Sequence, residues 1–257
     1  MSIGANIHEN AKVGKGTVVE PFATIGDDVI IGENCWIGPN AVIMSGTRMG
    51  DNCKVFPGAV VGAIPQDLKY NGEYTTTEIG NNVTIRECVT INKGTTDRNY
   101  TKVGDNCLLM AYVHVAHDCV IGNGCIIANS VNIAGHVVVG NCVILEGTVA
   151  IQQFVEIGDY AFIAGGSLVR KDVPPFVKAA KEPICFAGVN AVGLKRRGFT
   201  DEQVRHIEDI YRVLYIQNNN LTKAVDIADK EVADSDHKKM VLDFIRESDK
   251  GVIRGMI

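Results

Sequence analysis

The sequence contains no uninterrupted run of 18 apolar residues, so it does not indicate a membrane-spanning helix. Its first residues, Met-Ser-Ile-Gly-Ala-Asn, lack the basic and apolar regions of a signal peptide. None of the eight cysteines belongs to a C-x-x-C pair, which argues against a zinc site or a thiol redox motif. These absences predict a cytoplasmic protein with reduced cysteines and no membrane span.

The first two thirds of the chain also lack the periods of a helix, a coiled coil or an ordinary strand. They repeat in hexads instead: an aliphatic residue or Met returns at each sixth position, and a small or β-branched residue usually stands four positions later. The aliphatic positions are Ile7, Val13, Val19, Ile25, Ile31, Ile37, Ile43, Met49, Val55 and Val61, then Ile79, Ile85 and Ile91, then Val103, Leu109, Val115, Ile121, Ile127, Ile133, Val139, Leu145, Ile151, Ile157, Ile163 and Val169.

Two apolar positions in every hexad suit a short strand with one inward aliphatic side chain and a small residue at each corner. Such repeats are typical of a parallel β-helix with three faces and about 18 residues per coil. A β-sandwich, whose strands recur every 8–12 residues or so, fits this pattern poorly. Five cysteines occupy the small position and are expected to pack as small apolar side chains: Cys35, Cys53, Cys107, Cys119 and Cys125.

Two interruptions break the repeat, near residues 62–78 and 93–102. Loops that leave a rigid scaffold often carry binding residues, and the first interruption contains the polar pair Asp67 and Lys69. The second interruption could be no more than a tolerated insertion. The repeat fades after Val169, and the following Asp-Val-Pro-Pro segment is expected to close the last coil, because proline breaks a strand ladder.

The remainder of the chain has a helical period. Thr200 and Gln203 fit a capping box at the start of a helix, and Ser235 is suited to begin a later one. Residues 218–220, three asparagines, predict a turn between helices. His206 and His237 are expected to face solvent. We therefore expect a β-helix domain at 1–190 and a small helical domain at 191–257 that caps it.

Three of the six histidines lie close together in the sequence, at His114, His117 and His136. They fall outside the inward positions of the repeat, so their side chains should point outward. Residues three hexads apart stack one coil above another, about 4.8 Å apart, which places His117 beside Gly135. A histidine base next to a free backbone N–H suits acyl transfer, in which the N–H stabilises an oxyanion.

A zinc site with three histidine ligands is the competing interpretation of this cluster. It is known in β-helical carbonic anhydrases, but the spacing here does not resemble theirs, so no metal and no cofactor are expected.

Charge points to anionic partners. The net charge of −5 argues against nucleic acid, yet residues 165–199 carry seven cations and two acids, a local charge of +5. Such a zone suits an anionic small molecule or an acidic protein, although a solvated surface without a partner explains it equally well. Lys195, Arg196 and Arg197 stand between glycines, where arginine could hold phosphate groups.

Five motifs together resemble the UDP-N-acetylglucosamine O-acyltransferase family over essentially the whole chain. They are Gln66 to Tyr70, His114 to Cys119, Ala134 to His136, Asp172 to Pro175 and Gly193 to Phe199. The resemblance implies a left-handed β-helix followed by a small helical domain. It also implies a homotrimer that transfers a 3-hydroxyacyl chain from acyl carrier protein to the 3-hydroxyl of UDP-N-acetylglucosamine, the first step of lipid A biosynthesis.

The resemblance also implies roles for individual residues. His117 would be the general base, Asp118 its orienting carboxylate, and Gly135 the oxyanion donor with His136 close by. Substrate-binding positions would be Gln66, Asp67, Lys69, His114, His136, Gln153, Asn190, Arg196 and Arg197. Gly165 would stand where the family limits acyl-chain length, and a glycine there leaves room for a long chain.

Two positions depart from the family pattern: Gln152 and Asn92 stand where better-known members have histidine. Two other functions remain open at this point. One is the later N-acyltransferase of the same pathway, which carries an additional N-terminal domain. The other is a β-helix that binds a ligand or carrier without catalysis, for which loss of the His117–Gly135 pairing would be the expected signature.

Overall fold

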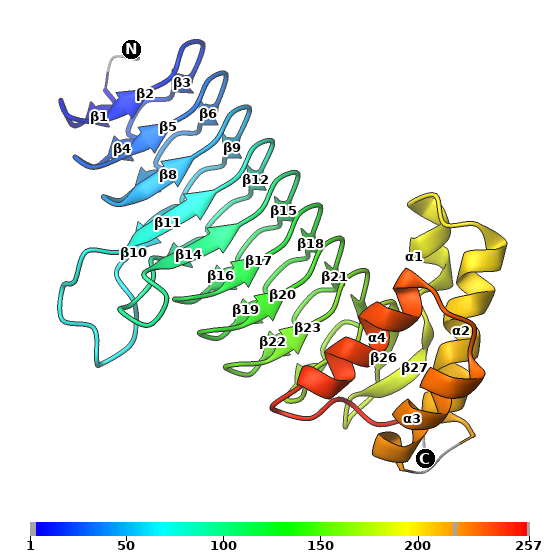
Figure 1. Cartoon of the computed structure of the whole chain (residues 1–257). Coiled ribbons are helices and arrows are strands. Elements are labelled where there is room, and N and C mark those ends of the chain that lie inside the picture. The colour runs from blue at the N-terminus through cyan, green and yellow to red at the C-terminus, as the bar shows by residue number, and fades with distance from the viewer. Residues whose placement is uncertain (1–3, 218–219, 256–257) are drawn as a thin grey trace.

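The computed structural model describes residues 4–217 and 220–255. Its short strands form three mainly parallel sheets that run the length of a left-handed β-helix, and four helices lie at the far end (Figure 1). This confirms the predicted architecture and excludes the β-sandwich. Among the described helices, none is long and apolar enough to cross a bilayer.

We name the sheets A, B and C in the order in which the chain passes through them. Sheet A contains β1 (Asn6–Ile7), β4 (Thr24–Ile25), β7 (Val42–Ile43), β10 (Val60–Ala63), β13 (Thr90–Asn92), β16 (His114–Val115), β19 (Asn132–Ile133), β22 (Ala150–Ile151) and β25 (Leu168–Val169). Sheet B contains β2 (Lys12–Val13), β5 (Ile30–Ile31), β8 (Thr47–Met49), β11 (Thr76–Ile79), β14 (Tyr100–Val103), β17 (Val120–Ile121), β20 (Val138–Val139) and β23 (Glu156–Ile157). Sheet C contains β3 (Val18–Val19), β6 (Trp36–Ile37), β9 (Lys54–Val55), β12 (Thr84–Ile85), β15 (Leu108–Leu109), β18 (Ile126–Ile127), β21 (Ile144–Leu145), β24 (Phe162–Ile163), β26 (Val177–Ala180) and β27 (Cys185–Val189).

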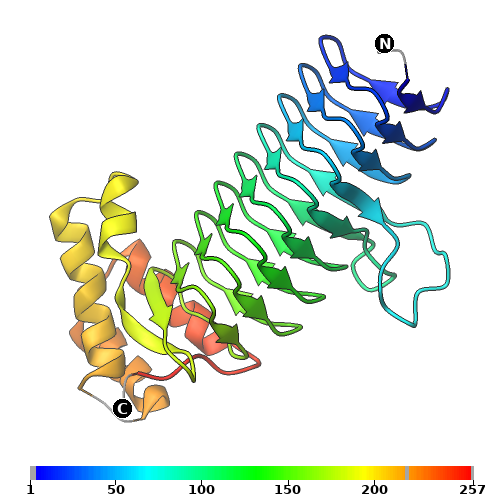
Figure 2. The ribbon, with the colours of Figure 1, turned by 180° about the vertical axis from the view of Figure 1, so that it is seen from behind.

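The three corners of each coil are named by the sheets they join. Most strands pair at an interval of three hexads, as Ile25 does with Ile43. Val61 instead pairs with Ile91, and Ile79 with Val103, so the interval lengthens to five and then to four hexads. Both insertions therefore leave the scaffold at the A–B corner, where they project side by side (Figures 1 and 2).

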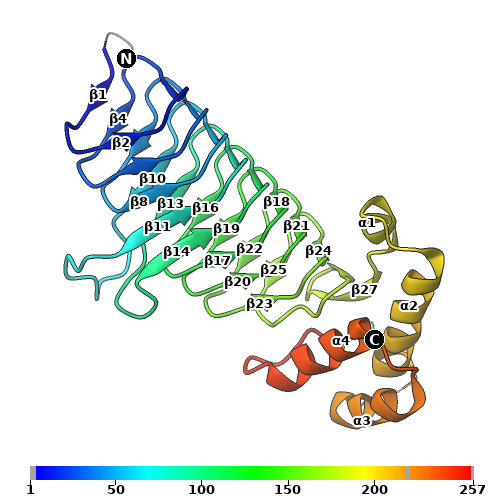
Figure 3. The ribbon, with the colours of Figure 1, turned by 45° about the horizontal axis from the view of Figure 1, so that its top comes forward.

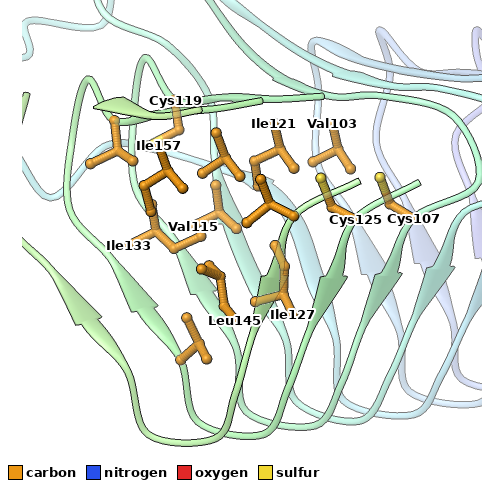
Figure 4. Packing of buried hydrophobic residues seen from close by; sticks show 14 of the residues in the cluster. Val103, Cys107, Val115, Cys119, Ile121, Cys125, Ile127, Ile133, Leu145 and Ile157 are labelled. Atoms are coloured by element: carbon orange, nitrogen blue, oxygen red, sulfur yellow. The ribbon is translucent and has the colours of Figure 1, made fainter. Parts of the chain in front are cut away.

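The core is the narrow interior between the three sheets. The inward aliphatic residues from Val19 onward and the five predicted cysteines are buried there, whereas Ile7 and Val13 in the first coil are partly exposed; the cysteines are free (Figure 4). Their thiols donate to backbone carbonyls of the neighbouring coil, as Cys119 Sγ does to the Ala134 carbonyl oxygen at 3.1 Å. The cysteines thus pack as small side chains whose one polar atom has a partner.

The end of the β-helix differs from the sequence prediction. The segment that follows Val169 does not close the last coil: Val173 pairs with Ile157, and β26 pairs with β24 through Ala179 and Ile163. The interval between these partners is shorter than three hexads. The last coil therefore departs from the hexad spacing, although its strands still pair with those of the coil before. Pro174 and Pro175 fall between the paired residues, at a turn that needs no ladder N–H, and β27 then adds antiparallel to β26.

The helices are α1 (Ala191–Arg196), α2 (Asp201–Tyr215), α3 (Leu221–Glu231) and α4 (Asp236–Glu247). They lie beyond the last coil, with α1 set apart from α3 and α4 (Figure 3). The capping box of Thr200 and Gln203 is confirmed, and Ser235 caps α4. Of the predicted asparagine turn, Asn220 caps α3, whereas residues 218 and 219 lie outside the described residues.

Two histidines in this region are less exposed than predicted. His237 packs edge-on against Phe176 and lies beside Phe199, and burial lowers its pKa. His206 shares a 2.7 Å hydrogen bond with the Ser235 hydroxyl. Both side chains are half-buried, because α4 packs against α2 on that side.

Candidate active site

The A–B corner brings together the histidines and both insertions. His117 follows β16, Gly135 follows β19 and Gln153 follows β22, so the three residues stack on successive coils. A Cβ atom placed on Gly135 would lie 2.6 Å from His117 Cε1, which measures how closely the imidazole approaches this backbone. The predicted pairing of His117 with Gly135 is therefore present.

His117 is held on one side by its neighbour in the chain. Its Nδ1 lies 2.8 Å from Asp118 Oδ2, and the Asp118 side chain is fully buried. Asp118 adopts a left-handed backbone conformation, with φ at +59°, which turns its carboxylate back toward the histidine. Because an ionised carboxylate only accepts hydrogen bonds, this contact assigns the proton to Nδ1 and leaves Nε2 as an acceptor.

The ionised state of Asp118 is favoured by the second insertion. Burial alone would raise the pKa of this carboxyl group, but hydrogen bonds from Thr95 and His117 outweigh burial and lower it. The Thr95 hydroxyl donates to Oδ2 at 2.7 Å, and the Thr95 N–H donates to Oδ1 at 2.9 Å. The second insertion is thus part of the site rather than a merely tolerated loop.

The prediction that His117 points outward needs correction. The imidazole lies outside the core, yet His117 is only 8% exposed. Asp67 of the first insertion comes within 4.0 Å of Nε2, and Thr95 of the second insertion bonds Asp118, the carboxylate that faces Nδ1. Regular coils alone would leave this corner open, whereas the two insertions enclose it.

His136 lies beside His117, with ring centroids 5.0 Å apart and the rings nearly perpendicular. Its Nδ1 is 3.0 Å from Asp97 Oδ2, and its ring stacks on Phe154 at 4.5 Å. Asp97 and Phe154 were not identified from the sequence. For Phe154 the available signal was its register, three hexads after His136, whereas Asp97 belongs to the second insertion, which has no register.

His114 lies on the outer face of sheet A, in β16, rather than at the corner itself. Its Nδ1 is 2.8 Å from the Thr90 hydroxyl, one coil away. Burial, with a smaller contribution from His117, lowers the pKa of His114 and favours the neutral imidazole. Nearby Asn92 is buried and donates to the Ile64 carbonyl, so it anchors the start of the first insertion.

The first insertion places its three predicted residues differently. Asp67 faces His117, whereas Gln66 and Lys69 are exposed. Asp67 also accepts a hydrogen bond from the Lys69 N–H at 2.9 Å, which tightens the turn. At the base of the loop, the Tyr74 hydroxyl donates to Asp28 at 2.9 Å and accepts from Arg48 at 3.0 Å.

The backbone N–H of Gly135 is not used by the scaffold. Its neighbours are used, since the Ala134 N–H donates to the Ile151 carbonyl and the His136 N–H to the His117 carbonyl. Among the described residues, no acceptor takes the Gly135 N–H. An unused donor next to an imidazole acceptor is the arrangement that acyl transfer requires.

Other predicted residues lie elsewhere on this chain. Asn190 and Arg197 contact the B–C corner, where Asn190 donates to the Tyr160 carbonyl and Arg197 to the Gly124 carbonyl. Arg196 is exposed at the end of α1, the short helix that contains part of the cationic segment between the glycines. Gly165 lies at the C–A corner, and its N–H donates to Glu146. One subunit therefore does not bring these four residues to His117.

Comparison with known proteins agrees with this geometry. Residues 172–253 match the sequence profile described as UDP N-acetylglucosamine O-acyltransferase, domain 2. Residues 4–35, 28–63 and 100–135 match the bacterial transferase hexapeptide profile. An acyl-[acyl-carrier-protein]–UDP-N-acetylglucosamine O-acyltransferase from a Sulfurihydrogenibium species is 52% identical over 249 residues, covering 96% of this chain and 92% of that protein.

The chain belongs to the UDP-N-acetylglucosamine O-acyltransferase family. It is thus an acyltransferase of the hexapeptide-repeat type.

Solved structures of the family superpose closely. The UDP-N-acetylglucosamine acyltransferase of Bacteroides fragilis is 45% identical with a TM-score of 0.97, and the alignment covers 99% of this chain and 100% of the other. The Francisella novicida enzyme is 37% identical with a TM-score of 0.95, with 99% and 94% covered.

Proposed function

We propose that this O-acyltransferase family member transfers a 3-hydroxyacyl chain from acyl carrier protein to the 3-hydroxyl of UDP-N-acetylglucosamine, and thereby begins lipid A biosynthesis in the cytoplasm. The names of its relatives and the open Gly135 N–H beside His117 support this reaction. The N–H is the observation that carries the proposal, because this unused donor lies directly beside the imidazole of His117, as acyl transfer requires.

In this mechanism His117 is the general base. Its Nε2 takes the proton of the sugar 3-hydroxyl while that oxygen attacks the thioester carbonyl carbon, and Asp118 stabilises the resulting imidazolium. The Gly135 N–H donates to the carbonyl oxygen as it becomes an oxyanion. When the intermediate collapses, the carbon–sulfur bond breaks and His117 returns the proton to the departing thiolate sulfur.

The same residues support a reaction without metal. His117, Asp118 and His136 offer donor atoms within 4.8 Å of one another, close enough to hold a cation. Asp118, however, already accepts hydrogen bonds at both oxygens, from Thr95 and from His117. A metal would have to displace these bonds and take Asp118 away from the histidine it orients, so we assign no metal to the proposed reaction.

Replacing His117 with alanine tests the reaction and the base together. We expect kcat for transfer from 3-hydroxyacyl carrier proteins to fall by a factor on the order of 10³, the range of general-base contributions. The protein should stay folded, because the imidazole lies outside the aliphatic core, and the lost bond to buried Asp118 should lower the thermal unfolding temperature by a few degrees at most. A wild-type protein inactive with every chain length would contradict the proposed function and direct attention to the N-acyltransferase substrate or to binding without turnover.

We further propose that the working enzyme is a homotrimer whose sites lie between subunits. Asn190, Arg196 and Arg197 lie at or beyond the B–C corner of their own chain, away from His117. A threefold arrangement can bring the B–C corner of one subunit to the A–B corner of the next. Gln66, Lys69, His114, His136 and Gln153 would then contact the sugar nucleotide from one side, and the arginines would hold its phosphates from the other.

Subunit mixing tests this arrangement. Arg196→Ala should raise the dissociation constant for UDP-N-acetylglucosamine, and His117→Ala should abolish transfer. Trimers assembled from both variants should regain part of the activity, because some sites then combine an intact His117 with an intact Arg196. Mixed trimers without activity would place both residues in a site formed by one chain.

Gly165 is the proposed determinant of acyl-chain length. A Cβ placed on it would lie 3.2 Å from the Gly147 carbonyl oxygen and point toward the C–A corner of the neighbouring coil. A larger side chain would narrow the space beside sheet A, so the glycine is compatible with a long acyl chain.

A further inference from the structure

We propose that Thr95, in the second insertion, is a positioning residue for the catalytic pair of His117 and Asp118. It bonds both oxygens of the Asp118 carboxylate and so fixes which oxygen accepts the hydrogen bond from His117. The proposal rests on the function proposed above. It gives the insertion a specific task that neither the repeat nor the resemblance assigns.

The hydrogen bonds around Asp118 divide the two oxygens between separate partners. Oδ1 accepts from two backbone donors of the insertion, the Thr95 N–H at 2.9 Å and the Arg98 N–H at 3.3 Å. Oδ2 accepts from the Thr95 hydroxyl at 2.7 Å and from His117 Nδ1 at 2.8 Å. Thr95 is thus the one described residue that bonds both oxygens, like a clamp across the carboxylate.

Because both residues are buried, the hydrogen bonds from Thr95 to Asp118 are difficult to replace. Asp118 is 0% exposed and Thr95 is 8% exposed, so water has little access to replace a missing donor. A buried carboxylate that loses a hydrogen bond is destabilised in its ionised form. The Asp118 carboxylate is then free to rotate toward other donors. His117 thereby loses the fixed acceptor that determines its tautomer and the direction of its Nε2 atom.

Only an insertion could supply the clamp at this place. The Asp118 N–H is already taken by the Thr101 hydroxyl of the preceding coil at 2.8 Å, which fixes the backbone but not the carboxylate. A regular turn there would have to pass from β13 into β14 without the residues that now cover Asp118. The added residues fold over the corner, and Asn99 N–H closes the loop on the Thr95 carbonyl at 2.7 Å.

Several charged groups face the same pair. His136 Nε2 lies 3.8 Å from Asp118 Oδ2, and His136 Nδ1 faces Asp97. Asp67 faces His117 Nε2, and His114 is close enough to His117 for the two rings to influence each other. Loss of the Thr95 hydroxyl should shift the acidic limb of activity to higher pH. The reason is that the Thr95 hydroxyl is one of the donors that lower the pKa of Asp118, so the Asp118 carboxyl then ionises at higher pH.

The test compares Thr95→Val with Thr95→Ser. Valine keeps the shape of threonine but lacks the hydroxyl, whereas serine keeps the hydroxyl. We expect Thr95→Val to lower kcat about 10-fold, to leave KM for UDP-N-acetylglucosamine nearly unchanged, and to move the acidic limb of kcat/KM upward by roughly half a pH unit or more. Thr95→Ser should restore both the rate and the pH profile.

Two matched valine substitutions serve as controls. Thr96 is exposed, so Thr96→Val should alter neither stability nor rate. Thr101 is buried and bonds only the Asp118 backbone, so Thr101→Val should lower the unfolding temperature without moving the acidic limb.

A Thr95→Val enzyme with a wild-type pH profile and kcat would overturn the positioning role, and so would Thr101→Val and Thr95→Val having identical profiles. Wild-type protein without transfer activity would instead refute the proposed function, so the two failures are distinguishable. If Thr95→Val does not fold, a Thr95→Ser enzyme with a tenfold lower kcat and a shifted limb would likewise contradict the proposal.

Discussion

The A–B and B–C corners of this β-helix are built from the same repeat and differ in how they use one backbone N–H. At the B–C corner, the second residue after each inward aliphatic is usually Asp or Asn, and its Oδ1 accepts the N–H of the equivalent residue one coil earlier. The acceptors of this ladder are Asp51, Asn81, Asp105, Asn123, Asn141 and Asp159, at 2.6 to 2.9 Å. At the A–B corner the equivalent residues include His117, Gly135 and Gln153, and no described acceptor takes the N–H of Gly135.

The comparison assigns different tasks to the two corners: the B–C corner stabilises the scaffold, and the A–B corner carries the chemistry. The ladder satisfies each N–H with a side chain from the next coil, and it also explains the glycine before each Asp or Asn. A Cβ on Gly104, for instance, would lie 2.5 Å from Asn123 Oδ1. The A–B corner gives up this arrangement, so its backbone donor remains available to a substrate, and two insertions cover the corner instead.

Among variants that change the two corners, Gly135→Ala should have the largest effect, because it fills the A–B corner. The new Cβ would lie 2.6 Å from His117 Cε1, and His117 cannot yield without leaving Asp118. We expect kcat to fall about 100-fold, as misplacement of a catalytic group by about 1 Å can do. Steady-state kinetics with unfolding curves would measure it.

Gly147→Ala is the matched control for that substitution. Gly147 occupies the equivalent position at the C–A corner, where a Cβ would lie 3.5 Å from the Asn129 carbonyl oxygen. This variant should keep nearly wild-type activity. Equal activity losses in both variants would mean that corner glycines matter for folding alone.

Gln153→Asn should extend the ladder onto the catalytic corner. Gln153 stands one coil after Gly135, as Asn141 stands one coil after Asn123, so the shorter amide should accept the Gly135 N–H. We expect kcat to fall about 10-fold while the protein becomes slightly more stable, because the oxyanion donor is then occupied.

Gln153→Ala provides the comparison, since it removes the same amide without supplying a new acceptor. It should raise KM for the sugar nucleotide and leave the unfolding temperature unchanged. A Gln153→Asn enzyme indistinguishable from Gln153→Ala would argue that the Gly135 N–H has no part in the rate.

The smallest effect on rate should follow Asn123→Ala, at the B–C corner. It removes the acceptor of the Asp105 N–H, a 2.7 Å bond near the surface. We expect a loss of about 1 kcal/mol in the free energy of unfolding, and about 2–4 °C in Tm for a chain of this size, with kcat unchanged. Reduced kcat with unaltered Tm would contradict the division between the two corners.

Much of the site was within reach of the sequence because a rigid repeat converts spacing into position. His117 and Gly135 are three hexads apart, and the register places them on adjacent coils. Phe154 was missed although it stands three hexads after His136, whereas Thr95 and Asp97 were missed because they lie in an insertion. Insertions have no period, so the way a loop folds back over its own corner cannot be counted from residue spacing.

The C-terminal errors have a similar cause. The sequence around Pro174 lacks the hexad pattern, yet the chain continues to pair because the edge of sheet C is still open to another strand. His237 stands in an otherwise ordinary amphipathic helix, and only the docking of α4 against Phe176 and Phe199 covers it.

The sequence by itself determined the three-sided β-helix, its inward residues and the stacking of His117 on Gly135. The reason is that backbone pairing repeats at a fixed interval, so the position of a residue in the repeat fixes its place in the coil. The tertiary structure alone decided that both insertions close over the same corner, that Thr95 clamps Asp118, and that the arginines lie at another corner. Those contacts join segments whose separation in the chain follows no period, so they depend on packing and hydrogen bonding that no interval encodes.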